Sequence, residues 1–128
     1  MDRQAIIDNL LDHYERPRNQ GALDDADVVM PGGIPDCGDT ITLYLKVEAG
    51  RIAALTFEGQ GCTVSQAAAS ILTDYVRDQP VERVALLDDA EFYVALGREV
   101  VQSRPRCASL ALNTLKAALL QYRRSAER

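Results

Sequence analysis

The chain has 128 residues, of which 47% are hydrophobic and 26% charged, and its formal net charge is −5 at pH 7. This length suffices for one domain with its own core, so we expect a single domain over residues 1–128. The negative charge argues against a nucleic-acid or membrane-surface binder, because both need a basic surface. The apolar runs are too short for a membrane span and acids interrupt the N-terminal one, so we expect a cytoplasmic protein without a secretory signal.

The first half of the chain predicts one helix and three strands. Apolar residues recur at helical spacing over residues 2–16, which indicates an amphipathic helix. Residues 27–30 form a short apolar run before a proline and two glycines, which favours a brief edge strand. Residues 40–48 alternate strictly between apolar and polar side chains, and residues 51–59 predict the returning strand after a turn. We therefore expect a three-stranded antiparallel sheet.

The second half of the chain predicts helices. Residues 62–77 are rich in alanine and small polar residues, which favours a helix packed closely on the sheet. Residues 79–97 predict one or two short helices, and residues 105–123 a long terminal helix whose basic end suits its dipole. The predicted fold class is therefore α+β, with an N-terminal helix and a C-terminal group of helices on the sheet.

Each of the three cysteines lies at the boundary of a predicted element. Cys37 lies in the turn before the second strand, Cys62 begins the alanine-rich helix, and Cys107 lies in the first turn of the last helix. Helix N-termini stabilise anions, so we expect a lowered pKa for the thiols of Cys62 and Cys107. Free thiols in such a chain favour metal ligands or catalytic groups over a disulfide framework. Buried cysteines that serve only as small hydrophobic residues are the alternative.

An aspartate completes the candidate site. Asp39 lies two residues after Cys37, and strand periodicity can place both side chains on one face. Three cysteines and one aspartate suit Zn(II), or an iron–sulfur cluster with one weaker oxygen ligand. The spacing is not that of a zinc finger, so three unrelated thiols are the competing interpretation. The boundary positions and the neighbouring glycines favour the metal site.

Four sequence blocks then point to a family. The segments DHYERPRNQG, PDCGD, GQGCTVSQAAAS and RPRCASLALNTLKAAL resemble, in order, the signature blocks of the IscU/SufU-type iron–sulfur cluster assembly proteins, which are homologous to the NifU N-terminal domain. The resemblance implies a compact SufE/NifU-like α+β domain with a three-stranded antiparallel sheet. It also implies a scaffold, not an enzyme, that accepts persulfide sulfur from a cysteine desulfurase and passes a transient cluster to apo-proteins.

The same resemblance assigns roles to residues. The implied ligands of a cluster, 2Fe-2S in type, or of Zn(II) are Cys37, Cys62 and Cys107, with Asp39 as fourth ligand or release element. Cys107 is the implied sulfur acceptor, and the other two cysteines take part in the sulfur chemistry. We expect a monomer or a weak homodimer.

The chain departs from both branches of this family. Arg106 stands where the IscU branch has a histidine, and VQSRPR replaces the LPPVK-like motif that binds a dedicated Hsp70 chaperone, so we do not expect that partner. A basic residue before the third cysteine resembles the SufU branch, but the insertion of that branch between the second and third cysteines is missing. Beside the scaffold, a SufU-like Zn-dependent sulfurtransferase and a structural zinc domain therefore stay open. Exposed loops and an aspartate ligand argue against the structural zinc domain.

A few other residues carry expectations. His13 is the only histidine, and we expect a structural role for it, with Leu10 and Tyr14 in the core. A guanidinium at Arg106 would stabilise a thiolate or persulfide at Cys107.

Overall fold

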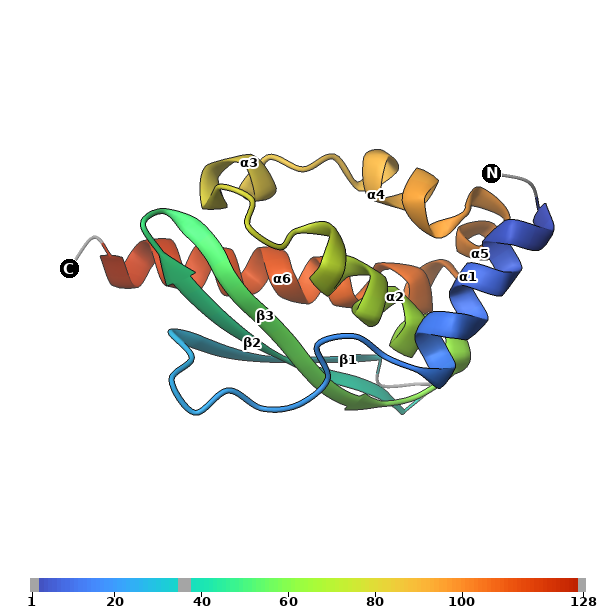
Figure 1. Cartoon of the computed structure of the whole chain (residues 1–128), viewed down its shortest axis with the longest axis horizontal. Coiled ribbons are helices and arrows are strands. Elements are labelled where there is room, and N and C mark those ends of the chain that lie inside the picture. The colour runs from blue at the N-terminus through green and yellow to red at the C-terminus, as the bar shows by residue number, and fades with distance from the viewer. Residues whose placement is uncertain (1–2, 35–37, 127–128) are drawn as a thin grey trace.

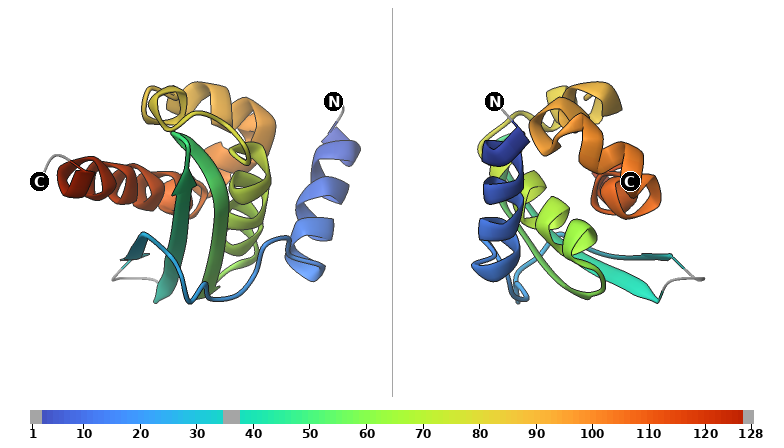
Figure 2. Two further views of the ribbon diagram at one scale, coloured as in Figure 1. Left: turned by 60° about the vertical axis from the view of Figure 1, so that its left-hand side comes forward. Right: turned by 90° about the vertical axis from the view of Figure 1, so that its right-hand side faces the viewer.

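The computed structural model describes residues 3–34 and 38–126 of the chain. Figure 1 shows a three-stranded sheet with helices on one of its faces. In chain order the elements are α1 (Arg3–Glu15), β1 (Val28–Ile34), β2 (Asp39–Glu48), β3 (Arg51–Gln60), α2 (Thr63–Tyr75), α3 (Val81–Ala85), α4 (Asp89–Leu96), α5 (Arg98–Ser103) and α6 (Pro105–Ala126). Helices α2 and α6 lie side by side on the sheet, and α1 packs along α2 (Figure 2).

The sheet has the predicted antiparallel arrangement, with β2 between β1 and β3. The alternation along β2 is also confirmed, because Ile41, Leu43 and Leu45 are buried beneath the helices while the intervening side chains are more exposed. The burial pattern extends back to Asp39 at the start of β2, whose side chain is buried on the same face. The fold class predicted from the sequence is therefore confirmed, and an acidic side chain lies on the helix-covered face.

Strand β1 is longer than the predicted strand over residues 27–30. It continues through a proline and two glycines to Ile34, which pairs with Asp39. A proline is tolerated because β1 is an edge strand, where one side of the backbone needs no sheet partner. Gly32 has a packing role, since a Cβ atom there would lie 2.2 Å from the Oγ1 atom of Thr114 in α6. The residues that signalled a strand end therefore allow β1 to approach α6 closely.

Residues 79–97 contain two short helices, α3 and α4, which confirms the prediction of one or two, and α5 follows immediately after that range. Asp88 caps the N-terminus of α4 by accepting a hydrogen bond from the Ala90 amide at 3.0 Å. Gly97 ends α4 with φ at 113°, and α5 begins at the next residue. A glycine with a positive φ angle ends one helix and lets a second begin in a new direction. None of the helices in the described part of the chain is long and apolar enough to cross a membrane.

The core lies between the sheet and the helices α2 and α6. Helix α2 presents three alanines with no exposed surface, Ala67, Ala68 and Ala69, and their small side chains permit the close packing predicted for this helix. Helix α1 contributes Leu10, which is buried as expected. Tyr14 was expected in the core but is 43% exposed, because α1 turns its Leu10 and His13 side towards α2.

Candidate metal centre

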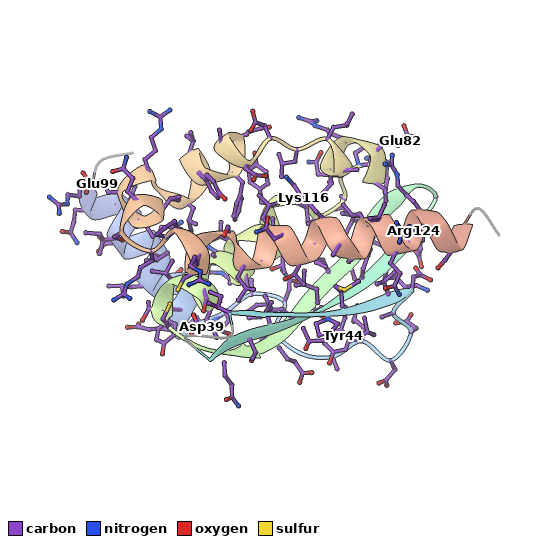
Figure 3. The ribbon with its side chains drawn as sticks, turned by 180° about the vertical axis from the view of Figure 1, so that it is seen from behind. Asp39, Tyr44, Glu82, Glu99, Lys116 and Arg124 are labelled. Carbon is purple, nitrogen blue, oxygen red and sulfur yellow. The ribbon has the colours of Figure 1, made fainter. Side chains whose placement is uncertain are left out.

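Two of the three cysteines and the predicted aspartate come together at one end of the sheet. Asp39 begins β2, Cys62 caps the N-terminus of α2, and Cys107 lies in the first turn of α6. The candidate ligand atoms of these three residues all lie within 4.8 Å of one another. Figure 3 shows Asp39 beneath the N-terminal end of α6. The structure thus brings together three residues that lie far apart in the sequence.

Asp39 is held as an ionised carboxylate. Its side chain is only 4% exposed, and the Cys107 thiol donates a hydrogen bond to its Oδ2 atom at 3.3 Å. Burial raises the pKa of Asp39, but hydrogen bonds from the side chains of Cys107, Cys62 and Ser65 and from the Cys62 amide outweigh it and lower the pKa below its usual value. A buried carboxylate that stays ionised is suited to a cation.

Cys62 owes its position to the start of α2. Its backbone is extended, with φ at −70° and ψ at 165°, and its Sγ atom accepts a hydrogen bond from the Ser65 amide at 3.5 Å. Gly61 precedes it with φ at 152°, and a Cβ atom there would lie 2.6 Å from the Cγ atom of Asp39. Both the backbone and the lack of space therefore require glycine next to Cys62.

Cys107 behaves differently from the expectation. Its side chain is 7% exposed, and burial, together with hydrogen bonds and charge interactions with Cys62 and Asp39, raises the pKa of its thiol to about 12. The prediction of a lowered thiol pKa at this helix N-terminus was therefore wrong, because burial beside a carboxylate outweighs the helix dipole. Without a cation, Cys107 carries a proton and shares it with Asp39.

The fourth predicted residue, Cys37, lies outside the described residues. Next to that segment, Gly38 has φ at 72°, and its amide donates a hydrogen bond to the Ile34 carbonyl at 3.0 Å. Gly38 therefore supports the turn predicted before β2. Arg106 precedes Cys107 in the chain and is one of the α6 residues that line the groove between β1 and α6.

His13 lies apart from the metal centre and fastens α1 to α2. It is buried, and its Nδ1 atom lies 2.7 Å from the Ser70 hydroxyl, which also accepts a hydrogen bond from the Arg18 amide at 2.8 Å. Because the Ser70 oxygen accepts the bond from Arg18, its own hydrogen is available to the Nδ1 atom of His13. An Nδ1 atom that accepts a hydrogen bond belongs to a neutral imidazole. Burial is the main cause that lowers the pKa of His13, in line with the structural role expected for it.

Two polar residues of the site were not predicted from the sequence. Ser65 and Gln66 lie in the first turn of α2, and both are buried. Gln66 donates to the Ser65 hydroxyl at 3.2 Å and to the Thr40 carbonyl at 3.5 Å. Their position three and four residues after Cys62 could have revealed them, since a polar side chain at the third helical position often hydrogen bonds to the backbone at the helix N-terminus.

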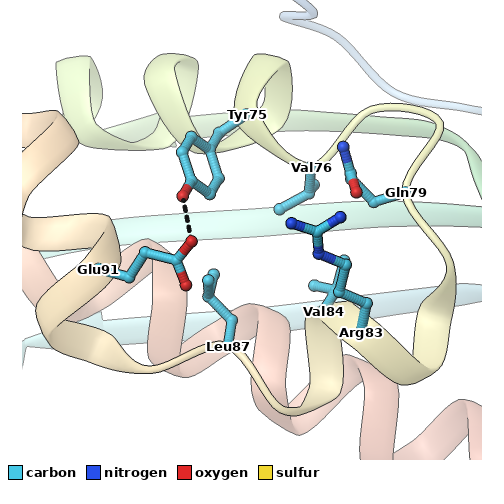
Figure 4. A pocket seen from close by; sticks show the side chains of 7 residues that line it. All are labelled: Tyr75, Val76, Gln79, Arg83, Val84, Leu87 and Glu91. Atoms are coloured by element: carbon cyan, nitrogen blue, oxygen red, sulfur yellow. Dashed lines mark hydrogen bonds between the residues drawn. The ribbon is translucent and has the colours of Figure 1, made fainter.

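A separate pocket of about 250 Å³ lies between α2, α3 and α4. Figure 4 shows Tyr75 facing Glu91, with a hydrogen bond of 3.2 Å between them, and Arg83 on the opposite wall. None of the residues that line this pocket belongs to the Asp39, Cys62 and Cys107 group.

A three-stranded sheet under helices, with thiols and a carboxylate gathered at its end, defines a small α+β protein with a candidate metal centre. Residues 5–128 match the family described as the NifU-like N terminal domain. The chain therefore belongs to this family, which confirms the resemblance found in the sequence.

Its relatives carry two kinds of name. The iron–sulfur cluster assembly scaffold protein IscU of Thermotoga maritima is 37% identical over 131 residues, covering 90% of this chain and 92% of that protein. The IscU of Escherichia coli is 30% identical over 127 residues, covering 96% and 98%. The zinc-dependent sulfurtransferase SufU of Bacillus subtilis is 38% identical over 73 residues, covering 57% of this chain and 49% of that protein.

Solved structures share the fold. A crystal structure described as a hypothetical protein superposes with a TM-score of 0.74 at 30% identity, covering 92% of this chain and 98% of that chain. The N-terminal part of a NifU-like protein from Brucella abortus gives a TM-score of 0.76 at 20% identity, covering 93% and 98%, and supports the fold alone.

Proposed function

We propose that the protein is an iron–sulfur cluster assembly scaffold that receives sulfur from a cysteine desulfurase and passes a transient cluster to apo-proteins. The observation that carries this proposal is the convergence of Asp39, Cys62 and Cys107 from three separate elements, with ligand atoms within 4.8 Å. Thiolates are the ligands of iron–sulfur clusters, and a carboxylate adds a harder, more exchangeable donor. Cys37, two residues before Asp39, is the proposed remaining ligand.

The geometry suggests how the site receives its cargo. In the absence of a cation, the Cys107 thiol donates to the Asp39 carboxylate at 3.3 Å. A metal ion that binds both residues replaces that proton, which leaves to solvent. In the sulfur step, the thiolate of Cys107 attacks the outer sulfur of the desulfurase persulfide, so a new persulfide forms on Cys107 and the desulfurase thiolate leaves. Because Cys107 is buried, this step requires its side chain to become accessible, and Arg106 beside it would stabilise the anion.

A Zn-dependent sulfurtransferase is the second candidate. Two thiols and a carboxylate also fit Zn(II), and the basic residue before Cys107 together with the similarity to SufU favours this function. A purely structural zinc site is less well supported, because closed structural sites use sulfur and histidine rather than a carboxylate. Either metal function would reside in one domain over residues 1–128, acting in the cytoplasm as a monomer or weak homodimer.

Anaerobic purification followed by an absorption spectrum and metal and sulfide analysis tests the proposal. A brown protein that contains sulfide and transfers its cluster to an apo-ferredoxin supports the scaffold. A colourless protein with stoichiometric zinc that accepts sulfur from a desulfurase supports the sulfurtransferase instead. A protein that holds neither iron nor zinc, even after anaerobic reconstitution, would contradict both candidate functions. Ser103→Ala, at an exposed position of α5, is a control that should behave like the wild type.

A further inference from the structure

The two oxygens of the Asp39 carboxylate face different neighbours. Oδ2 accepts the hydrogen bond from the Cys107 thiol and therefore points towards the candidate ligands. Oδ1 lies near Ser65, because a Cβ atom placed on Gly61 would lie 2.8 Å from Oδ1 and 2.9 Å from the Ser65 hydroxyl oxygen. Oδ2 thus contacts the candidate ligand Cys107, while Oδ1 lies near Ser65 in the first turn of α2.

Ser65 has a single hydroxyl hydrogen and two possible acceptors for it. Its side chain is 1% exposed, and its oxygen already accepts a hydrogen bond from Gln66 at 3.2 Å. The hydrogen can go to the Cys62 carbonyl, which lies 3.1 Å away, or to the Asp39 carboxylate beside it. The structure gives this hydrogen to the Cys62 carbonyl. A charged carboxylate is a stronger acceptor than a backbone carbonyl, so a rotation of the hydroxyl would let Asp39 take the hydrogen instead.

Gln66 fixes the position of Ser65 relative to β2. Its amide nitrogen donates both to Ser65 and to the carbonyl of Thr40, the residue after Asp39. Figure 1 shows the start of α2 next to the end of β3, which pairs with the start of β2. The strand that carries Asp39 and the helix that begins at Cys62 are therefore linked by two buried polar side chains.

We propose that Ser65 is a positioning residue that anchors Oδ1 of Asp39, so that Oδ2 alone is presented to a bound metal ion, and that Gln66 orients Ser65. This inference rests on the proposed function. It means that the bond from Oδ2 to a metal can break while the carboxylate stays anchored through Oδ1. The site can then give up its cargo without a rearrangement of β2.

A double-mutant cycle on zinc affinity tests this role. Zinc affinity of the full-length apo-protein is measured by competition with a chromophoric chelator for the wild type, Ser65→Ala, Asp39→Ala and the double variant. Ser65→Ala should weaken zinc binding by about 10-fold or more, the usual effect of losing the partner that orients a metal ligand. In the Asp39→Ala background, the same change should alter affinity by less than about twofold, because Ser65 then has nothing to position.

The chain offers a matched control. Ser109 in α6 also donates to the carbonyl three residues earlier, that of Arg106, at 3.3 Å, but it is not among the described residues that hydrogen bond to Asp39. Ser109→Ala should therefore keep wild-type zinc affinity. Ser65→Thr retains the hydroxyl, so its zinc affinity should be close to that of the wild type and clearly higher than that of Ser65→Ala. Ser65→Ala also leaves intact the backbone hydrogen bond from residue 65 to the Cys62 sulfur.

The outcomes separate the inference from the proposed function. An unchanged affinity of Ser65→Ala, or an equal loss with and without Asp39, would overturn the positioning role while leaving the scaffold proposal intact. A wild type that binds neither zinc nor a cluster would overturn the proposed function and the inference with it. If Ser65→Ala does not fold, Gln66→Met is tested instead, because it removes the donor to Ser65. Gln66→Met should weaken zinc binding in the wild-type background but not in the Asp39→Ala background.

Discussion

Replacing Gly32 by alanine should force β1 and α6 apart and destabilise the protein. The new Cβ atom would lie 2.2 Å from the Oγ1 atom of Thr114 and 3.2 Å from its Cβ atom, both closer than ordinary contact. Thr114 is 5% exposed, and its hydroxyl donates to the Leu110 carbonyl at 2.7 Å, so a rotation away from the new methyl group meets a filled core and breaks that bond. Overpacking of this kind costs about 1–3 kcal/mol.

Urea unfolding followed by circular dichroism measures this cost. The matched control is Gly33→Ala, whose Cβ atom would lie 3.3 Å from the Asp39 carbonyl and should cost clearly less. Thr114→Ala removes the atom of closest contact, so in that background Gly32→Ala should destabilise the protein by about 1 kcal/mol less than in the wild type. Because α6 carries Cys107, Gly32→Ala should also weaken zinc binding. A Gly32→Ala protein as stable as the wild type, or a cost that Thr114→Ala does not reduce, would refute this reasoning.

Three further predictions concern pH and the candidate ligands. The unfolding free energy should fall as the pH drops through about 6.5, the ordinary pKa of histidine, because the unfolded chain protonates His13 there while the folded protein, in which burial lowers that pKa, resists protonation. His13→Gln should flatten this pH dependence in urea titrations, and an unchanged slope would assign it to other groups. Replacing any one proposed cysteine ligand by serine should abolish cluster retention, measured by absorption after anaerobic desalting, and a normal cluster in Cys107→Ser would remove that residue from the ligand set. Asp39→Ala should leave the fold nearly intact but slow cluster transfer to an apo-ferredoxin, and equal or faster transfer would contradict a releasing role for this carboxylate.

Local sequence signals predicted most of the fold and the positions of two site residues. Helical spacing predicted α1, α2 and α6, and the alternation along β2 predicted which of its faces is buried. Cys62 and Cys107 were placed at helix starts because the glycines before Cys62 and the proline before Cys107 are local signals. These features depend on residues near one another in the chain, which is why the sequence alone was sufficient.

The failures have a common physical cause, which is tertiary contact. Pro31 and Gly32 indicate a strand end by propensity, but their place on an edge strand against α6 keeps them in β1. The pKa of Cys107 was predicted from its helix position, whereas burial beside Asp39 decides it. Ser65 received no role because its contact with Asp39 joins a helix to a strand that is distant in the sequence.

X-ray absorption spectroscopy at the zinc edge of the Zn-loaded protein is the most direct test of the candidate metal centre. A site formed by three cysteines and Asp39 should give three sulfur ligands at about 2.3 Å and one oxygen ligand at about 2.0 Å. Cys62→Ser and Cys107→Ser should each lower the sulfur count by one, and Asp39→Ala should remove the protein oxygen ligand. A coordination shell without sulfur, or a sulfur count that neither cysteine variant changes, would contradict the assignment of Cys62 and Cys107 as metal ligands.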